Sequence, residues 1–134
     1  MNPRTDWVEL YTASTGRLAR TPFLIAAAIL IAVACLYESI AASPVRWLTG
    51  WIAYPVLLYA IACIVAKRMH DRGRSGWWAG LVVLAIIAVW PWPEGFVDFL
   101  FSLVLAWSVI ELGVMGGEQG ANRFGPNPLR PIQA

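Results

Sequence analysis

The chain has 134 residues, of which 59% are hydrophobic and only 13% are charged, with a formal net charge of +2. Soluble domains have about 25% charged residues, so too little polar surface remains here to cover a soluble globule. This balance argues against a disordered chain and an ordinary soluble enzyme, and two cysteines are too few for a disulfide-stapled secreted module. The composition predicts a single integral membrane domain. Membrane strands would show alternating apolar residues, and none appear, so the domain is predicted to be all-α.

Four apolar stretches are predicted as transmembrane helices, at about residues 21–43, 47–66, 76–93 and 96–115. A helix rises about 1.5 Å per residue and a hydrocarbon core is about 30 Å thick, so each stretch can cross once its flanking residues are included. The remaining chain divides into a polar N-terminal segment, residues 1–20, and a tail rich in Gly and Pro, residues 116–134.

Local signals predict where these helices begin and end. Thr21-Pro22 is typical of an N-cap followed by proline in the first turn. Ser43-Pro44 predicts the end of the first helix, because the residue before a proline avoids the α region. Ser75 is expected to cap the third helix, and Pro55 predicts a kink in the second. A signal peptide ending near residues 41–43 is the alternative for the first stretch, although the leading segment is long and contains Asp6 and Glu9, which is atypical.

The basic residues are distributed unevenly along the chain. With four crossings, nine of the ten lysines and arginines lie on one side of the membrane, and only Arg46 lies on the other. The positive-inside rule then predicts that both termini are cytoplasmic. The nine residues are Arg4, Arg17, Arg20, Lys67, Arg68, Arg72, Arg74, Arg123 and Arg130.

The most informative polar stretch is the loop of residues 67–76, which joins the second and third apolar stretches. His70 and Asp71 stand there among four cations, and Gly73 and Gly76 permit backbone conformations that other residues resist. We expect this loop to lie beside the N-terminal segment and the tail. The candidate anion-binding or partner-binding residues are Arg17, Arg20, Arg68, His70, Asp71, Arg72, Gly73, Ser75, Gly76, Trp77, Trp78, Asn122 and Arg123.

Three motifs resemble those of the domain-of-unknown-function family 805, the YhaH-like bacterial inner-membrane proteins. They are GRLARTPF at residues 16–23, RMHDRGRSGWW at 68–78 and GANRFGPNP at 120–128. The second motif is specific, whereas the other two would be weak alone. The resemblance implies a four-helix protein of the bacterial inner membrane and supplies no reaction. Met69 stands where leucine is common, no tryptophan follows Phe23, and Asn127 replaces a usual aspartate, which removes one acidic partner from the tail.

Two interpretations of the basic face remain open. In the structural one, the cations set orientation and touch anionic lipid, while His70 donates to a carbonyl group. Asp71 would then accept from Arg17, Arg20 or Arg123 and tie the cytoplasmic segments together.

In the functional interpretation, the same face binds an anionic group. Arginine matches phosphate bidentately, and glycine-rich backbone can present N–H groups to an anion. Trp77 and Trp78 would flank a lipid head group at the depth of the membrane interface. The contacts would come from Arg68, Arg72, Arg123 and His70, with Asp71 orienting one arginine.

Glu111 is an acid predicted about one turn inside the cytoplasmic end of the fourth stretch. Desolvation requires such an acid to pair or to stay protonated, and we expect an arginine partner from residues 17–20 or 68–74. Asp98 and Glu38 lie near the other ends, where their carboxylates can reach water. Asp98 and Glu111 are about 220° apart around a helix, so a proton relay is poorly supported.

No enzymatic activity, cofactor or metal is expected. The sequence has no phosphate loop of the Walker type, no nucleophile elbow and no Cys/His cluster with metal-ligand spacing. Cys35 and Cys63 are expected at different membrane depths, too far apart for a disulfide. The loops are too small for a nucleic-acid surface.

The function predicted is an inner-membrane scaffold or accessory protein that binds anionic phospholipid head groups or a protein partner. A small oligomeric transporter or export component is the alternative, and a lipid-modifying enzyme comes third. The scaffold predicts that Glu111 is paired with an arginine, the transporter that Glu111 faces a cavity, and the enzyme that Asp71 or His70 lines a pocket for a head group.

Overall fold

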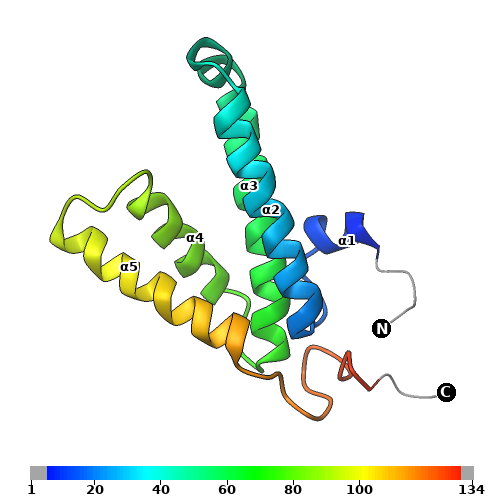
Figure 1. The fold of residues 1–134 in the computed structure, drawn as a ribbon. Helices are drawn as coiled ribbons and strands as arrows, with labels where there is room; N and C mark the ends of the chain where they lie inside the picture. Colours follow the sequence, from blue (N-terminus) through cyan, green and yellow to red (C-terminus); the bar gives the residue numbers. More distant parts are fainter. Residues whose placement is uncertain (1–5, 131–134) are drawn as a thin grey trace.

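A computed structural model describes residues 6–130 of the chain, which are helical with one isolated β-bridge between Asn122 and Gly125 and no strand (Figure 1). The prediction of an all-α chain is therefore confirmed. The elements are α1 (Trp7–Thr12), α2 (Arg20–Ile40), α3 (Ser43–Asp71), α4 (Trp78–Val89), α5 (Phe96–Ser108) and a π-helical segment, η1 (Val109–Val114), that continues α5.

Among residues 6–130, three helical segments are long and apolar enough to cross a membrane, namely α2, α3 and the continuous segment Phe96–Val114. Helix α4 is apolar but has only 12 residues, about 18 Å of rise, so the third predicted span is shorter than expected. Pro91 and Pro93 follow its end, as predicted, because proline cannot continue a helix. By length and composition, these helices are those of a membrane protein.

The second predicted span, residues 47–66, is longer at both ends. Helix α3 covers 29 residues and passes through Pro55 as one helix. Ser43-Pro44 does not end α2 but begins α3, because proline is tolerated in a first turn, where its missing N–H has no helical partner. At the other end, residues 67–71 extend α3 into the basic loop, which places Arg68 and Asp71 one turn apart.

Two residues that were predicted to cap helices, Thr21 and Ser75, do not cap them. Helix α2 begins at Arg20, and its N-cap is Ala19 without a side-chain cap, so Thr21 does not cap it. Ser75 does not cap α4 either, because the N-cap position is Trp77. The Ser75 hydroxyl instead accepts a hydrogen bond from the Trp77 backbone N at 3.4 Å, inside the turn that precedes the helix.

The helices form two hairpins of unequal length. Helices α2 and α3 make the longer one and α4 and α5 the shorter one, and the two diverge from the end where α3 is joined to α4 (Figure 1). The tail after η1 folds beneath this converging end. Large apolar side chains along both hairpins are exposed, including Leu24, Ile31 and Leu36 on α2 and Leu103 on α5. Such continuous apolar surface is typical of a lipid-facing one.

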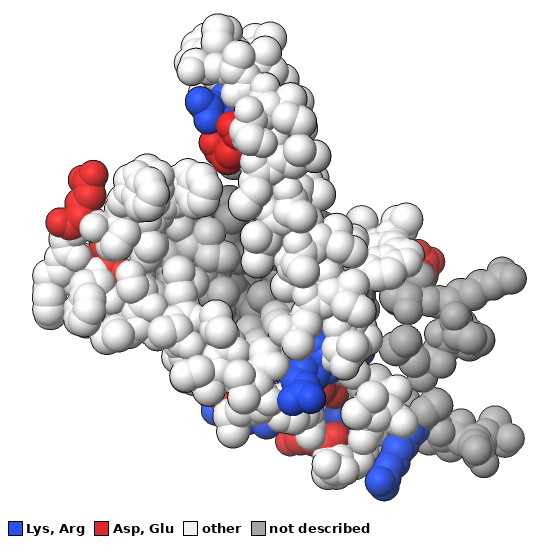
Figure 2. All heavy atoms as spheres, viewed as in Figure 1, with Lys and Arg blue, Asp and Glu red and all other residues white. Residues whose placement is uncertain are grey.

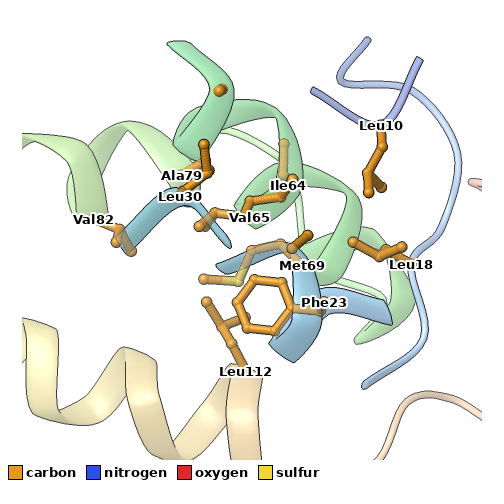
Figure 3. Packing of buried hydrophobic residues seen from close by; sticks show 13 residues of the cluster. Leu10, Leu18, Phe23, Leu30, Ile64, Val65, Met69, Ala79, Val82 and Leu112 are labelled. Carbon is orange, nitrogen blue, oxygen red and sulfur yellow. The ribbon is translucent and has the colours of Figure 1, made fainter. Parts of the chain in front are cut away.

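The hydrophobic core lies where the hairpins converge (Figure 3). Phe23 of α2, Ile64 and Met69 of α3 and Leu112 of η1 are all buried there. Val82 of α4 joins the same cluster, so α2, α3, α4 and η1 all contribute to it. This core sets the positions of the polar residues at the adjacent end of the helices.

A short helix in the N-terminal segment was not predicted. Asp6 caps α1 by accepting hydrogen bonds from the backbone N of Val8 and Glu9. Leu10 is buried in the core, and the Tyr11 hydroxyl donates to the Ala26 carbonyl at 3.2 Å. Burial raises the pKa of Tyr11. These contacts fasten α1 to the long hairpin.

Candidate functional site

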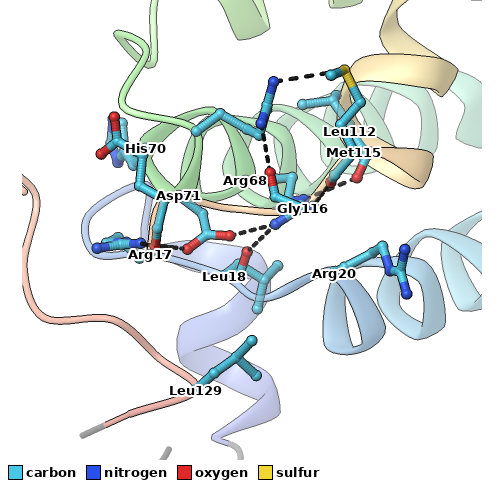
Figure 4. Close-up of polar contacts among 12 residues, drawn as sticks. Arg17, Leu18, Arg20, Arg68, His70, Asp71, Leu112, Met115, Gly116 and Leu129 are labelled. Carbon is cyan, nitrogen blue, oxygen red and sulfur yellow. Dashed lines mark hydrogen bonds and ion pairs between the residues drawn. The ribbon is translucent and has the colours of Figure 1, made fainter. Parts of the chain in front are cut away.

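Charged side chains gather at the converging end of the molecule (Figure 2). At their centre, the Asp71 carboxylate at the end of α3 is held by two arginines (Figure 4). Oδ1 accepts from Arg17 Nε at 3.1 Å and lies 3.0 Å from Arg17 Nη2, while Oδ2 accepts from Arg68 Nη1. The three side chains are almost fully buried, with exposed fractions of 4%, 1% and 0%. The predicted pairing of Asp71 with Arg17 is thus confirmed; its second partner is Arg68, not Arg20 or Arg123.

Arg68 also binds the carbonyl end of the last helical segment. Its Nε donates to the Leu112 carbonyl at 2.9 Å and its Nη2 to the Met115 carbonyl at 2.6 Å. Its Nη1 reaches the Leu18 carbonyl at 3.4 Å, in the N-terminal segment. The final carbonyls of a helix have no helical partners and carry partial negative charge, so a guanidinium group stabilises them. Arg20 extends the arrangement by donating to the Val114 carbonyl at 3.1 Å.

Glu111 forms a second carboxylate centre, on η1. Its Oε1 accepts from Arg72 Nε at 3.2 Å, from Arg72 Nη2 at 3.1 Å and from Arg74 Nε at 3.0 Å. The Glu111 side chain is 7% exposed, whereas that of Arg74 is 43% exposed. This arrangement confirms the predicted pairing of Glu111 with an arginine of residues 68–74. π-Helical segments are rare and often occur at functional sites, and here one contains the buried acid.

The tail after η1 is held against the end of α3 through His70 and Arg17. His70 Nδ1 lies 2.9 Å from the Gly16 carbonyl oxygen, and its ring stacks on Phe124 with 3.9 Å between centroids. The contact confirms the expected hydrogen bond of His70 to a carbonyl. Asn122 Nδ2 donates to the His70 carbonyl at 2.9 Å, and Arg17 donates to the carbonyls of Glu118 and Gly120. Thus the N-terminal segment, α3 and the tail are joined.

Glycines permit the close approach of the tail to α3. Gly73 has a φ of +69°, and a Cβ there would overlap the Glu118 carboxylate. A Cβ at Gly76 would lie 2.8 Å from His70 Nε2.

Asn127, which replaces a usual aspartate, is buried in the tail. Its Nδ2 donates to the Gln119 carbonyl at 2.7 Å, a bond that an ionised aspartate cannot make.

The four residues expected to contact an anion do not form an open site. Arg68 is fully buried and bonded to four oxygens of the protein. Arg123 is exposed on the tail, with its guanidinium carbon 4.7 Å from the Phe124 ring centroid, and it makes no ion pair among residues 6–130. Arg68 and Arg72 are not free to bind an anion, because their guanidinium groups already donate to carboxylates and backbone carbonyls of the protein.

The aromatic residues after the loop lie at the surface. Trp77 is 89% exposed and Trp78 is 42% exposed. Trp78 lies beside Trp107 of α5, with 5.9 Å between ring centroids. Arg74, which was not predicted as a site residue, lies beside the rings of Trp78 and Trp107. Its position four residues before Trp78 in the sequence could have indicated the first of these contacts.

This end of the molecule has a small pocket beside Asp71. Asp71 and the tail residues Gly117, Glu118 and Asn127 help line a pocket of about 220 Å³. Small-molecule sites are commonly about 300–1,000 Å³, and both Asp71 oxygens already face arginines, so the pocket offers little to a head group. Within the described part of the chain, no group of three or more His, Cys, Asp or Glu side chains is placed to hold a metal ion.

Comparisons with known proteins agree with the three sequence motifs. Residues 11–126 match the model of a family described as "Protein of unknown function (DUF805)". The chain is similar to proteins called "Uncharacterized protein YiiR" from Escherichia coli strain K12 and from Escherichia coli O157:H7. Each is 39% identical over 79 residues, which covers 52% of this chain and 53% of the relative. The match thus spans about half the length of these curated relatives. No solved structure matches the chain.

Proposed function

We propose, on the premise that this chain belongs to the DUF805 family of unknown function, that it is a scaffold or accessory protein of the bacterial inner membrane. The observation that carries the proposal is the polar layer formed by Arg17, Arg68, Asp71, Arg72, Arg74 and Glu111. In this layer, hereafter the arginine layer, each buried acid is held by two arginines. Such a layer fastens helices together and leaves neither acid available for chemistry or transport.

The proposed topology has four crossings and two cytoplasmic termini. Helix α4 would supply the fourth crossing, with the tryptophans near its ends at the interfaces and with local thinning of the bilayer around this short hairpin. The unequal distribution of basic residues supports this orientation, because the arginine layer and the tail then lie on the cytoplasmic side.

The cytoplasmic face would attract anionic lipid through its exposed cations. Arg20, Arg123 and Arg130 are exposed at this end, unlike the buried Arg17 and Arg68. A basic side chain near an anionic membrane surface contributes about 1 kcal/mol. The same exposed cations would serve an acidic protein partner, but the continuity of this face with the apolar hairpins favours lipid.

The contacts of Glu111 support this proposal over a transporter. An acid that carries ions or protons must be released from its partner during each cycle, whereas Glu111 shares one oxygen with two arginines. A lipid-modifying enzyme is disfavoured for a related reason, because the Asp71 carboxylate is already bound by Arg17 and Arg68.

The test is the lipid composition of polymer-extracted membrane discs. We expect discs with the wild-type protein to contain more anionic lipid than the bulk membrane, and the double variant Arg123→Gln, Arg130→Gln to lose part of that excess. Arg46→Gln is the matched control, because Arg46 lies at the far end of the long hairpin and pairs with Glu38. A wild-type composition equal to that of the bulk membrane would contradict the proposal.

A further inference from the structure

An open groove runs along the seam between α4 and α5. It has a volume of about 430 Å³ and is lined by Trp78 and Leu81 of α4, by Leu103, Val104 and Trp107 of α5, and by Arg74. Trp78 and Leu81 lie one turn apart on α4, as do Leu103 and Trp107 on α5, so their side chains project from the same side of each helix. The walls are therefore apolar, and one end carries a cation.

Arg74 is positioned at that end by three contacts. Its Nε donates to Glu111 at 3.0 Å, and its guanidinium carbon lies 6.0 Å from the Trp78 ring centroid and 5.9 Å from that of Trp107. Within residues 6–130, its two terminal nitrogens make no hydrogen bond, and 43% of the side chain is exposed. Arg74 thus keeps donors available, although the rest of its side chain is held in place.

The charges around the groove leave a positive excess. Glu111 is the only carboxylate that pairs with Arg72 and Arg74 among the described residues, so two guanidinium groups share one negative charge. Arg72 is the more enclosed of the two, with 21% of its side chain exposed, and it also donates to the Gly116 carbonyl at 2.5 Å. The unbalanced charge is therefore presented at Arg74, where the groove begins.

We propose that this groove binds one anionic phospholipid of the surrounding bilayer, with its phosphate at the terminal nitrogens of Arg74. The glycerol and the first carbons of an acyl chain would lie along Leu81, Leu103 and Val104. This inference rests on the proposed membrane location and deepens it, because it assigns a defined lipid site to a face otherwise expected to attract lipid diffusely.

A phospholipid fits both parts of the groove better than a helix of a second copy does. Guanidinium groups match phosphate oxygens bidentately, and tryptophans flank head groups at the membrane interface. An apolar helix would fill the walls but would leave the unpaired donors of Arg74 covered and unsatisfied, which is costly. The charge complementarity at Arg74 therefore favours the lipid.

Native mass spectrometry of the full chain, titrated with phosphatidylglycerol or phosphatidylcholine in mixed micelles, tests the proposal. We expect wild-type protein to keep one phosphatidylglycerol per chain in preference to phosphatidylcholine. Arg74→Gln should weaken phosphatidylglycerol binding about fivefold, the effect of one basic side chain near a phosphate, and leave phosphatidylcholine binding unchanged. Arg46→Gln is the matched control, because this partly exposed arginine pairs with Glu38 near the start of α3 and does not line the groove.

A second variant tests the apolar walls independently of Arg74. Leu103 is 51% exposed, so Leu103→Trp should fold, fill the groove and remove the tightly held lipid. The site is disproved if both variants keep the wild-type lipid, or if wild-type protein binds the two lipids equally. It is also disproved if wild-type protein is a lipid-free dimer that Leu103→Trp converts to a monomer.

Failure of this inference is distinguishable from failure of the proposed function. If wild-type discs are enriched in anionic lipid but neither Arg74→Gln nor Leu103→Trp changes lipid binding, the diffuse attraction holds and the defined site does not. If the discs show no enrichment and no lipid adduct survives, both are rejected.

Discussion

Gly117 lies directly against the Asp71 carboxylate, so close that a Cβ at position 117 would overlap Asp71 Oδ2. Asp71 has no freedom to move aside, because Arg17 and Arg68 hold its two oxygens. The backbone N of Glu118 donates to the Asp71 carbonyl at 2.8 Å, which keeps the tail at this distance. The first turn of the tail is therefore built around the end of α3.

Gly117→Ala should destabilise the protein because the added methyl group meets this fixed carboxylate. Overpacking of this kind costs about 1–3 kcal/mol. Thermal unfolding in detergent, followed by tryptophan fluorescence, measures the change. Gly116→Ala is the control, because no atom lies within 4 Å of a Cβ built there. Equal melting temperatures for the two variants would contradict this account of the tail.

Replacing Arg68 should have the largest effect of any single arginine. Arg68→Gln leaves Asp71 with one partner and the carbonyls of Leu112 and Met115 without their donor. Loss of one partner from a buried ion pair costs about 3–5 kcal/mol. Arg46→Gln removes a more exposed pair, so we expect a loss of at most about 1 kcal/mol. The comparison is made on the fraction that remains monodisperse after heating.

Glu111→Gln tests the second carboxylate centre. The variant keeps an acceptor oxygen but removes the charge that Arg72 and Arg74 share, so we expect a loss of about 1.5–3 kcal/mol, less than for Arg68→Gln because both arginines are partly exposed. Adding Arg72→Gln should cost less than the sum of the two single changes, because residues in one ion-pair network are coupled. Strict additivity in a double-mutant cycle would show that the pairing contributes nothing.

Cysteine labelling tests the proposed topology. In a background of Cys35→Ser and Cys63→Ala, an impermeant maleimide added to intact cells should label Glu94→Cys and not Arg123→Cys. Residue 94 lies between α4 and α5, and residue 123 lies in the tail. After the cells are opened, both should react. Labelling of both positions, or of neither, in intact cells would show that α5 and η1 do not separate the two sides.

The sequence by itself determined the helical class and the approximate position of each long apolar segment. A backbone in lipid must satisfy its own hydrogen bonds, so an apolar stretch of sufficient length forms a helix whatever its neighbours are. The pairing of Glu111 followed from the same physics, since a desolvated acid requires a partner. The motif around His70 and Asp71 likewise identified the polar end of the molecule and the family.

Only the tertiary structure decided which charges meet. Asp71 had several arginines as candidates, and the choice of Arg17 depends on a contact across 54 positions of the chain. The packing of α1 has the same origin, because Leu10 and Tyr11 are held by contacts with residues distant in the sequence. The attraction between two charges weakens with the distance between them, so each carboxylate pairs with the arginines that the folded backbone brings closest to it.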